Sequence, residues 1–138
     1  MKVKLSSTGP EMSRIIAGVM TWGDWGAKMN TSQIQKQIEA CVDLGVTTFD
    51  HADIYGGYTT ERDFGNAWKD MSIDRSDIQL ISKCGIKYPC DERDYNIKSY
   101  QTTYNYISWS VEQSLKHLNT EYLDLLLIHR PSPLMDPQ

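Results

Sequence analysis

Three apolar runs of this chain each end on an ionisable residue, and a tyrosine follows the first of them five positions later. In a parallel barrel the chemistry lies at the carboxyl ends of the strands, where successive strands meet around one opening. Groups that are distant in the sequence are therefore expected to come together there. The four residues are Asp50, Lys83 and His129 at the ends of the runs, and Tyr55 in the turn after Asp50.

These four side chains fit the reduction of a carbonyl group. A free tyrosine hydroxyl titrates near about pH 10, and an ammonium at Lys83 would stabilise its phenolate form, so Tyr55 could exchange a proton with substrate. Asp50 would keep Lys83 charged and oriented. His129 would donate a hydrogen bond to the substrate oxygen. None of the four can deliver a hydride, so a nicotinamide or similar cofactor is required at the same opening.

The elements that must position these groups alternate between strand and helix. Strand-like pieces at residues 3–5 and 14–16, around Gly9-Pro10, predict a hairpin over residues 1–16. The alternation that follows calls for a parallel sheet with right-handed crossovers. The core strands are expected at 15–20, 46–49, 78–83 and 122–128, and the helices are expected to begin near residues 31, 60 and 103.

Local signals add detail to these elements. Thr31 or Ser32 can cap the first helix, and Gly45 can end it. Residues 84–101 show no clear period and predict a loop of unusual length, of the kind that forms lids or substrate walls. The third helix is expected to bury Ile107, Val111, Leu115 and Leu118.

Two architectures suit this alternation, an open doubly wound sheet and a barrel. No glycine-rich phosphate-binding loop opens a helix anywhere in the sequence, which favours the barrel. A full (β/α)8 TIM-type barrel needs about 250 residues. The 138 residues therefore predict about the first four β/α units of such a barrel, over residues 15–131, after the amino-terminal hairpin.

Three segments of the chain resemble the signature segments of the aldo-keto reductase superfamily, in matching order and spacing. The likeness covers about residues 14–131, nearly the whole chain. It implies that Tyr55 is the general acid, that Lys83 and Asp50 tune it, and that His129 orients the carbonyl. The segments are residues 46–56, which contain DHADIYG, residues 81–85, ISKCG, and residues 125–131, LLLIHRP.

The resemblance also implies a cofactor and a substrate class. It implies NADPH as the usual hydride donor, with NADH left open, and aldehydes or ketones as substrates. By the same likeness Thr21 and Trp22 contact the nicotinamide ribose, which Asp50 also reaches, and Trp22 borders the substrate. Trp25 and Tyr88 follow strands on loops, so with Trp22 they are expected to form the walls of the pocket.

Members of this superfamily continue through strands five to eight, whereas this sequence stops at Gln138. By the resemblance, the absent part carries most of the cofactor-binding surface. Half a barrel also leaves sheet edges and an apolar interior open, which invites association. We therefore expect either a truncated reductase, inactive alone, or a half that is completed by a complementary carboxyl-terminal half or by a second copy of the chain.

Other interpretations compete with this one. Each of the four groups alone fits an ordinary structural role, but their shared position at strand ends favours one site. A metal-dependent barrel hydrolase could use His51 and Asp53 with Asp50 and His129. Strand alternation argues against that ligand set, because His51 points away from the face of Asp50. A third possibility is a non-catalytic module that uses the reductase fold for binding.

Composition narrows the partners and the compartment. The formal net charge is −4 with the two signs interspersed, and no basic stripe indicates nucleic-acid binding. The three cysteines form no C-x-x-C pair and show no metal-ligand spacing with the histidines, which predicts free thiols in the cytoplasm. The amino terminus lacks an apolar signal region, and no run is long enough to span a membrane.

Overall fold

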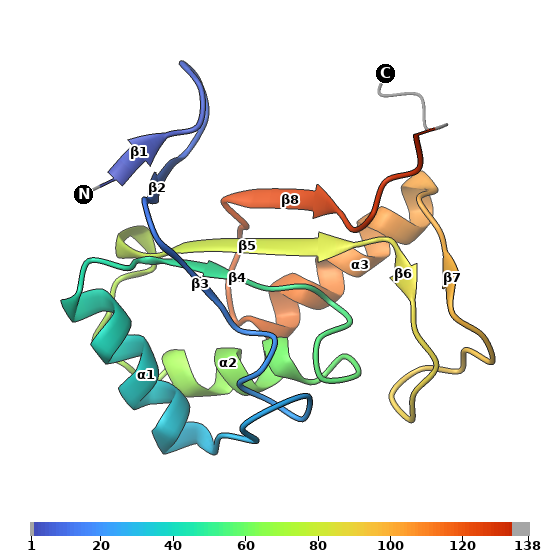
Figure 1. Ribbon diagram of the computed structural model, residues 1–138, viewed down its shortest axis with the longest axis horizontal. Helices are drawn as coiled ribbons and strands as arrows, with labels where there is room; N and C mark the ends of the chain where they lie inside the picture. The colour runs from blue at the N-terminus through green and yellow to red at the C-terminus, as the bar shows by residue number, and fades with distance from the viewer. Residues whose placement is uncertain (1, 134–138) are drawn as a thin grey trace.

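Four parallel strands form the central sheet of this chain, whose computed structural model describes residues 2–133. Hydrogen-bonded neighbours follow the order of the chain, so the sheet grows by one strand at a time (Figure 1). This topology confirms the predicted parallel sheet and corresponds to part of a barrel wall. The strands are β3 (Ile16–Gly18), β4 (Thr48–Asp50), β5 (Gln79–Cys84) and β8 (Leu125–Ile128).

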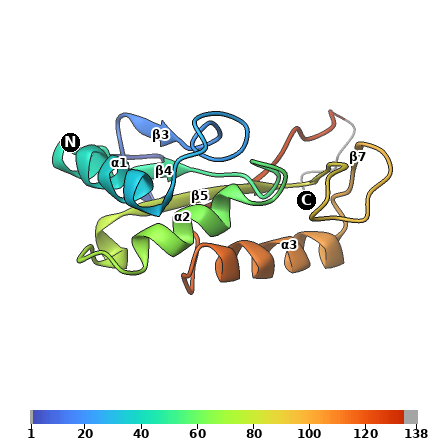
Figure 2. The same cartoon turned by 90° about the horizontal axis from the view of Figure 1, so that it is seen from below.

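Helices cover one face of this sheet (Figure 2). Phe49 of β4 and Leu80 of β5 are fully buried beneath them, in one cluster with Ile38 and Phe64 from the helices. Among residues 2–133, no helix is long and apolar enough to cross a membrane. The helices are α1 (Thr31–Asp43), α2 (Thr60–Trp68) and α3 (Tyr104–His117), and a short 3-10 helix, η1 (Arg75–Asp77), precedes β5.

The opposite face of the sheet is open and largely apolar. Ile16 and Leu127 keep 43% and 39% of their surface exposed there. This confirms the expectation that half a barrel leaves its interior open to water. This open face has a hollow of about 410 Å³, lined by Leu5, Met12, Ile16, Gly18, Asp50, Ile81, Leu125 and Leu127.

The predicted amino-terminal hairpin is present, formed by β1 (Lys2–Lys4) and β2 (Glu11–Ser13), but its second strand lies earlier than residues 14–16. Ser13 explains the difference. Its backbone N–H donates to the Thr48 hydroxyl at 2.9 Å, and its own hydroxyl accepts from the Thr48 N–H at 3.0 Å. These bonds tie the end of the hairpin to β4, so the chain leaves the ladder at Ser13 and enters β3.

The ends of α1 confirm one signal and correct another. Asn30, not Thr31 or Ser32, caps the helix, because its side chain accepts from the Gln33 N–H while the Gln33 side chain accepts from the Asn30 N–H. This reciprocal pair is a capping box. Gly45 follows the helix with φ of +75°, which confirms it as the residue after the C-cap.

The expected loop at residues 84–101 contains regular structure. Two short strands, β6 (Ile86–Lys87) and β7 (Ser99–Tyr100), pair in antiparallel fashion within it. Two residues per strand are too few to give a period that the sequence could reveal. The hairpin nevertheless brings Tyr100 back to the end of β5, where the Gln101 N–H donates to the Gly85 carbonyl at 2.9 Å.

The buried face of α3 is also different from the one expected. Tyr106, Ser110 and Ser114 are buried, whereas the predicted Ile107, Val111 and Leu115 are only half-buried. The buried face includes a polar contact, because the Ser114 hydroxyl hydrogen-bonds the buried carboxyl group of Glu61 on α2. Leu118, just beyond the helix, is fully buried as predicted.

Candidate active site

Asp50 and Lys83 lie on the open face of neighbouring strands. The register of β4 with β5 pairs Asp50 with Ile81, and Lys83 follows two residues later on the same face. The Lys83 ammonium lies 2.7 Å from the Asp50 carboxylate and 3.2 Å from the Tyr55 hydroxyl. It also donates to the carbonyl oxygen of His51 at 2.8 Å. The three protons of this ammonium therefore have three acceptors.

A tight turn carries Tyr55 back over the end of β5. The Asp53 N–H donates to the Lys83 carbonyl at 2.9 Å, which continues the sheet pairing beyond Asp50. Gly56 and Gly57 then take φ of +62° and +66°, a conformation that residues with a Cβ adopt only at a cost. The two glycines after the tyrosine thus allow the chain to reverse into α2. They leave the Tyr55 side chain at the opening where the carboxyl ends of the strands meet, which we call the mouth.

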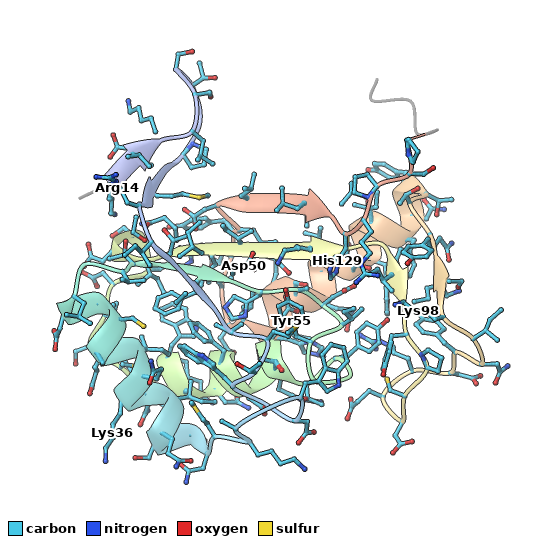
Figure 3. The ribbon with its side chains drawn as sticks, in the orientation of Figure 1. Arg14, Lys36, Asp50, Tyr55, Lys98 and His129 are labelled. Atoms are coloured by element: carbon cyan, nitrogen blue, oxygen red, sulfur yellow. The ribbon has the colours of Figure 1, made fainter. Side chains whose placement is uncertain are left out.

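His129 joins this group from the end of β8 (Figure 3). Its backbone N–H donates to the Cys84 carbonyl at 2.8 Å, and its ring stands edge-on to that of Tyr55 with centroids 6.2 Å apart. Burial lowers the pKa of His129, and the charge of Lys83 lowers it further. The imidazole is therefore neutral at pH 7, with one N–H to donate.

The structure thus brings Asp50, Tyr55, Lys83 and His129 to one opening, as the sequence predicts. The other expected site residues are Trp25, Tyr88, Thr21 and Trp22. The centroid of the Trp25 ring lies 6.4 Å from that of Tyr55 and 5.3 Å from that of Tyr88, so Trp25 borders the tyrosine and Tyr88 borders Trp25. Thr21 is exposed on the loop after β3.

Trp22 does not lie where a pocket wall requires. Its indole is only 8% exposed and contacts Phe49 and Phe64, at centroid distances of 6.2 Å each. The tryptophan is therefore part of the core on the helix-covered face, because the chain turns sharply after Val19 and directs the indole inward. A single residue position after a strand does not reveal which way such a turn points.

A second polar cluster lies behind the mouth, and sequence reasoning, which considered two of its members only as metal ligands, did not predict it. It comprises His51, Asp53 and Glu61, all buried. Burial lowers the pKa of His51 to about 3 and raises that of Asp53 to about 8, with the Glu61 charge adding to the latter. Burial likewise raises the pKa of Glu61, whose carboxyl accepts from the Ser82 hydroxyl at 2.6 Å. Glu61 stands in the first turn of α2, and nothing in its spacing along the sequence marks it as buried.

This cluster bears on the metal-site interpretation. The His51 ring contacts Phe64 with centroids 4.5 Å apart on the helix-covered face, whereas Asp50 faces the opposite side and binds Lys83. The expected ligand set is therefore divided between two faces of the sheet. Within the described residues, no group of three or more histidine, cysteine or acidic side chains is arranged to hold a metal ion.

Comparison with known proteins identifies the family. Residues 14–137 match the family model described as "Aldo/keto reductase family". The uncharacterized oxidoreductase YcsN of Bacillus subtilis is 47% identical over 93% of the chain, and oxidoreductase YdhF of Escherichia coli is 47% identical over 98%. The chain spans 42% and 44%, respectively, of the length of these two relatives.

Solved structures show the same fold. The aldo-keto reductase AKR11C1 from Bacillus halodurans, in its holo form, is 26% identical, with a TM-score of 0.75 over 93% of this chain and 39% of that chain. The parallel sheet described above is thus a part of the (β/α)8 barrel of these enzymes. On the match over residues 14–137 and the two relatives at 47% identity, this chain belongs to the aldo/keto reductase family.

Proposed function

We propose that this chain carries the proton-transfer site of an NAD(P)H-dependent oxidoreductase that reduces aldehydes or ketones to alcohols. The observation that carries the proposal is the position of Lys83, which contacts Asp50 at 2.7 Å and Tyr55 at 3.2 Å on the open face of the sheet. Family membership supports the reaction type. The particular substrate and the preference for NADPH are parts of the proposal.

The lysine decides which way the tyrosine proton points. Because the ammonium of Lys83 donates to the Tyr55 oxygen, the tyrosine O–H is directed away from the lysine and toward the mouth. A carbonyl oxygen bound there receives that proton as its carbon gains a hydride. The phenolate that remains is stabilised by the ammonium, and Asp50 keeps the ammonium charged.

His129 and the aromatic side chains position the carbonyl. The neutral imidazole donates a hydrogen bond to the substrate oxygen, which fixes that oxygen close to the Tyr55 hydroxyl. Trp25 and Tyr88 contact each other beside Tyr55 and exclude water from one side of the opening. Proton donor, orienting group and pocket wall are thus all present in this chain.

The residues of the mouth also fit part of a nicotinamide cofactor. Thr21 is exposed beside the end of β3, and the Val19 N–H donates to the Asp50 carbonyl at 3.2 Å, which keeps these two loops together. We assign Thr21 and the Asp50 carboxylate to the ribose next to the nicotinamide. When bound, the cofactor supplies the hydride that none of these side chains can deliver. NADPH is the proposed donor, and NADH is the alternative.

A complementary half is proposed to complete the barrel. The open face exposes Ile16 and Leu127, and the chain spans less than half the length of its curated relatives. A carboxyl-terminal half placed on this face would bury the apolar surface, with a second copy of the chain as the other candidate. The three cysteines are free, which supports a reducing compartment, and we propose the cytoplasm.

NADPH oxidation with an aromatic aldehyde tests the proposal, with and without a supplied carboxyl-terminal half. Tyr55→Phe removes the proton donor and is expected to lower kcat of the complemented enzyme by roughly 10²- to 10⁴-fold. Tyr122→Phe is the matched control, because this exposed ring lies before β8, at the other end of the strand from His129. Equal rates for the two variants would remove Tyr55 from its role. Binding of NADPH without any oxidation would support a non-catalytic module instead.

A further inference from the structure

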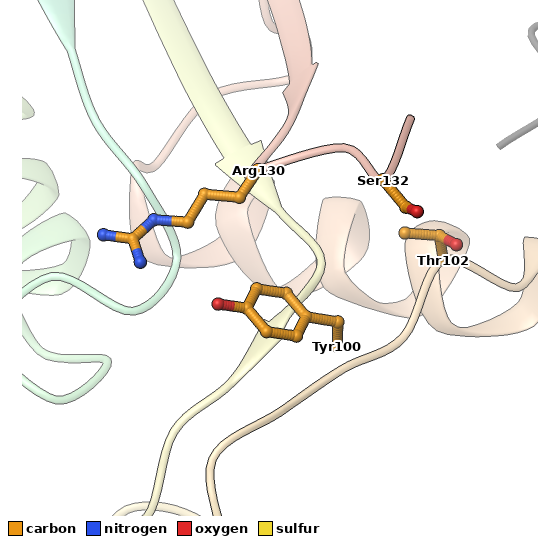
Figure 4. Close-up of a pocket in the computed structure, with 4 residues that line it drawn as sticks. All are labelled: Tyr100, Thr102, Arg130 and Ser132. Carbon is orange, nitrogen blue, oxygen red and sulfur yellow. The ribbon is translucent and has the colours of Figure 1, made fainter. Parts of the chain in front are cut away.

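A second pocket lies at the same end of the sheet as the four proposed catalytic side chains. It has a volume of about 420 Å³ and is lined by Tyr100, Thr102, Arg130 and Ser132. Figure 4 shows Arg130 and Tyr100 extending in the same direction from two separate segments, away from the hydroxyls of Thr102 and Ser132. The lining thus offers one guanidinium and three hydroxyl groups, and none of the four residues is acidic. Such a set of donors suits an anion.

The backbone places this pocket directly beside His129. Gly85 lies between them, because a Cβ at this position would come 3.6 Å from the Thr102 methyl group and 3.7 Å from the His129 backbone nitrogen and oxygen. Arg130 follows His129 in the chain and takes φ of +62°, an unfavourable value for a residue with a Cβ. Strain of this kind tends to be kept where it directs a functional side chain.

The electrostatics of the pocket favour a negative group. Thr102 and Thr103 lead into α3, a helix of 14 residues with no acidic residue in its first turn and no side-chain cap from Thr103. The positive end of the helix dipole therefore faces this region without a neutralising charge. Within residues 2–133, no ion pair uses the Arg130 guanidinium. The charges of Arg130 and Lys98 both reach His129.

We propose that this pocket binds an anionic oxygen group, a carboxylate or a phosphate, on the carbonyl substrate. Arg130 holds the anion through its fork of N–H donors, and the Tyr100 hydroxyl, which extends in the same direction, completes the subsite. The inference rests on the proposed function, since it places the reacting carbonyl between Tyr55 and His129. It defines the substrate class as aldehydes or ketones that carry a negative charge.

Ligand-observed NMR with the 138-residue chain tests the subsite without requiring hydride transfer. The probes are 4-formylbenzoate and its uncharged methyl ester, which share the aromatic aldehyde. The acid is expected to bind at least about tenfold more tightly than the ester, as a charge-assisted contact would give. Arg130→Gln should abolish this preference and leave binding of the ester unchanged.

Two variants control for general charge and for folding. Lys36→Gln removes one positive charge from α1, where Figure 3 shows Lys36 far from His129, and should keep the preference for the acid. Arg130→Lys keeps the charge but loses the fork, and it should retain only part of the preference. The unfolding midpoint of each variant is measured alongside. An acid that binds no better than its ester, or an Arg130→Gln variant that matches Lys36→Gln, would overturn the subsite.

Competition distinguishes the two kinds of anion. Inorganic phosphate and acetate are each titrated against bound 4-formylbenzoate. If phosphate displaces the probe at a lower concentration than acetate does, the substrate is phosphorylated. If acetate displaces it at a lower concentration than phosphate does, the substrate is carboxylated. If neither displaces the probe, the pocket does not bind anions.

The complemented reduction assay separates this inference from the proposed function. Reduction of the ester with no preference for the acid would overturn the anion subsite alone. Binding of the acid through Arg130 with no reduction of either aldehyde would overturn the proposed reaction alone.

Discussion

The two faces of the central sheet differ in what they contribute to the protein. On the helix-covered face, Phe49 and Leu80 are fully buried in a cluster with side chains from all three helices or their ends. On the open face, Leu127 remains 39% exposed, opposite Lys83 in the strand register and in the same hollow as Asp50. The same two strands, β4 and β5, thus supply apolar packing on one side and the Asp50–Lys83 ion pair on the other.

This difference shows how one strand can serve stability and chemistry at once. Phe49 and Asp50 are neighbours in β4, but alternation directs them to opposite faces. The covered face is not purely apolar, because His51 and Asp53 lie buried on it directly after the strand. Their charged forms are disfavoured there, whereas the charges of Asp50 and Lys83 are paired on the open side.

Phe49→Ala should have the largest effect on stability. The ring is fully buried between Trp22 and Phe64, so its removal leaves a cavity on the covered face. We expect the free energy of unfolding to fall by about 3–5 kcal/mol. Urea unfolding measures this as a lower midpoint with an unchanged m value. A loss below about 1 kcal/mol would mean that the helices do not pack tightly on this face.

Asp53→Asn should change how stability depends on pH. The raised pKa of Asp53, about 8 against 3.8, means that the folded chain holds a proton which the unfolded chain has lost. Stability from this group is complete below pH 4 and declines as pH rises to 8. His51 acts in the opposite sense between pH 3 and 6.5, because only the unfolded chain is protonated there. The contribution of Asp53 to stability is therefore best measured above pH 6.5.

Between pH 6.5 and 8 we expect Asp53 to lower the free energy of unfolding by about 1.4 kcal/mol per pH unit in the wild type. Asparagine resembles the protonated acid and removes this contribution. Glu61, whose pKa is also raised, adds a decline that both proteins share. The measurement is chemical unfolding at a series of pH values. Parallel pH profiles for wild type and variant would show that Asp53 is ionised in the folded state.

The sequence predicts the open face better than the covered one. Asp50, Lys83 and His129 were located because each ends an apolar run, and parallel strands bring such ends together. Tyr55 followed from its place in the next turn. The contact of Lys83 with the His51 carbonyl was not predictable, because backbone acceptors leave no trace in residue types.

The errors concern side chains whose direction depends on tertiary contacts. Trp22 was expected at the mouth and lies in the core, since the turn after β3 directs it toward Phe49. Aliphatic periodicity predicts one face of α3, but the face that is buried carries Tyr106, Ser110 and Ser114, the last bonded to Glu61. Arg130 directly follows His129, and this cation next to a strand end was an available signal for the second pocket.

Leu127→Gln should have the smallest effect and is the sharpest test of the comparison. The side chain is partly exposed on the open face, so a polar replacement of similar length is expected to cost no more than about 1 kcal/mol. Binding of an apolar dye should decrease at the same time, because the exposed apolar area shrinks.

Sedimentation at micromolar concentration is run in parallel. A loss above about 2 kcal/mol that grows with protein concentration would show that a second copy covers this face. Because both faces belong to the same strands, a small cost at Leu127 beside a large cost at Phe49 would place the stability of this half on its helix-covered side.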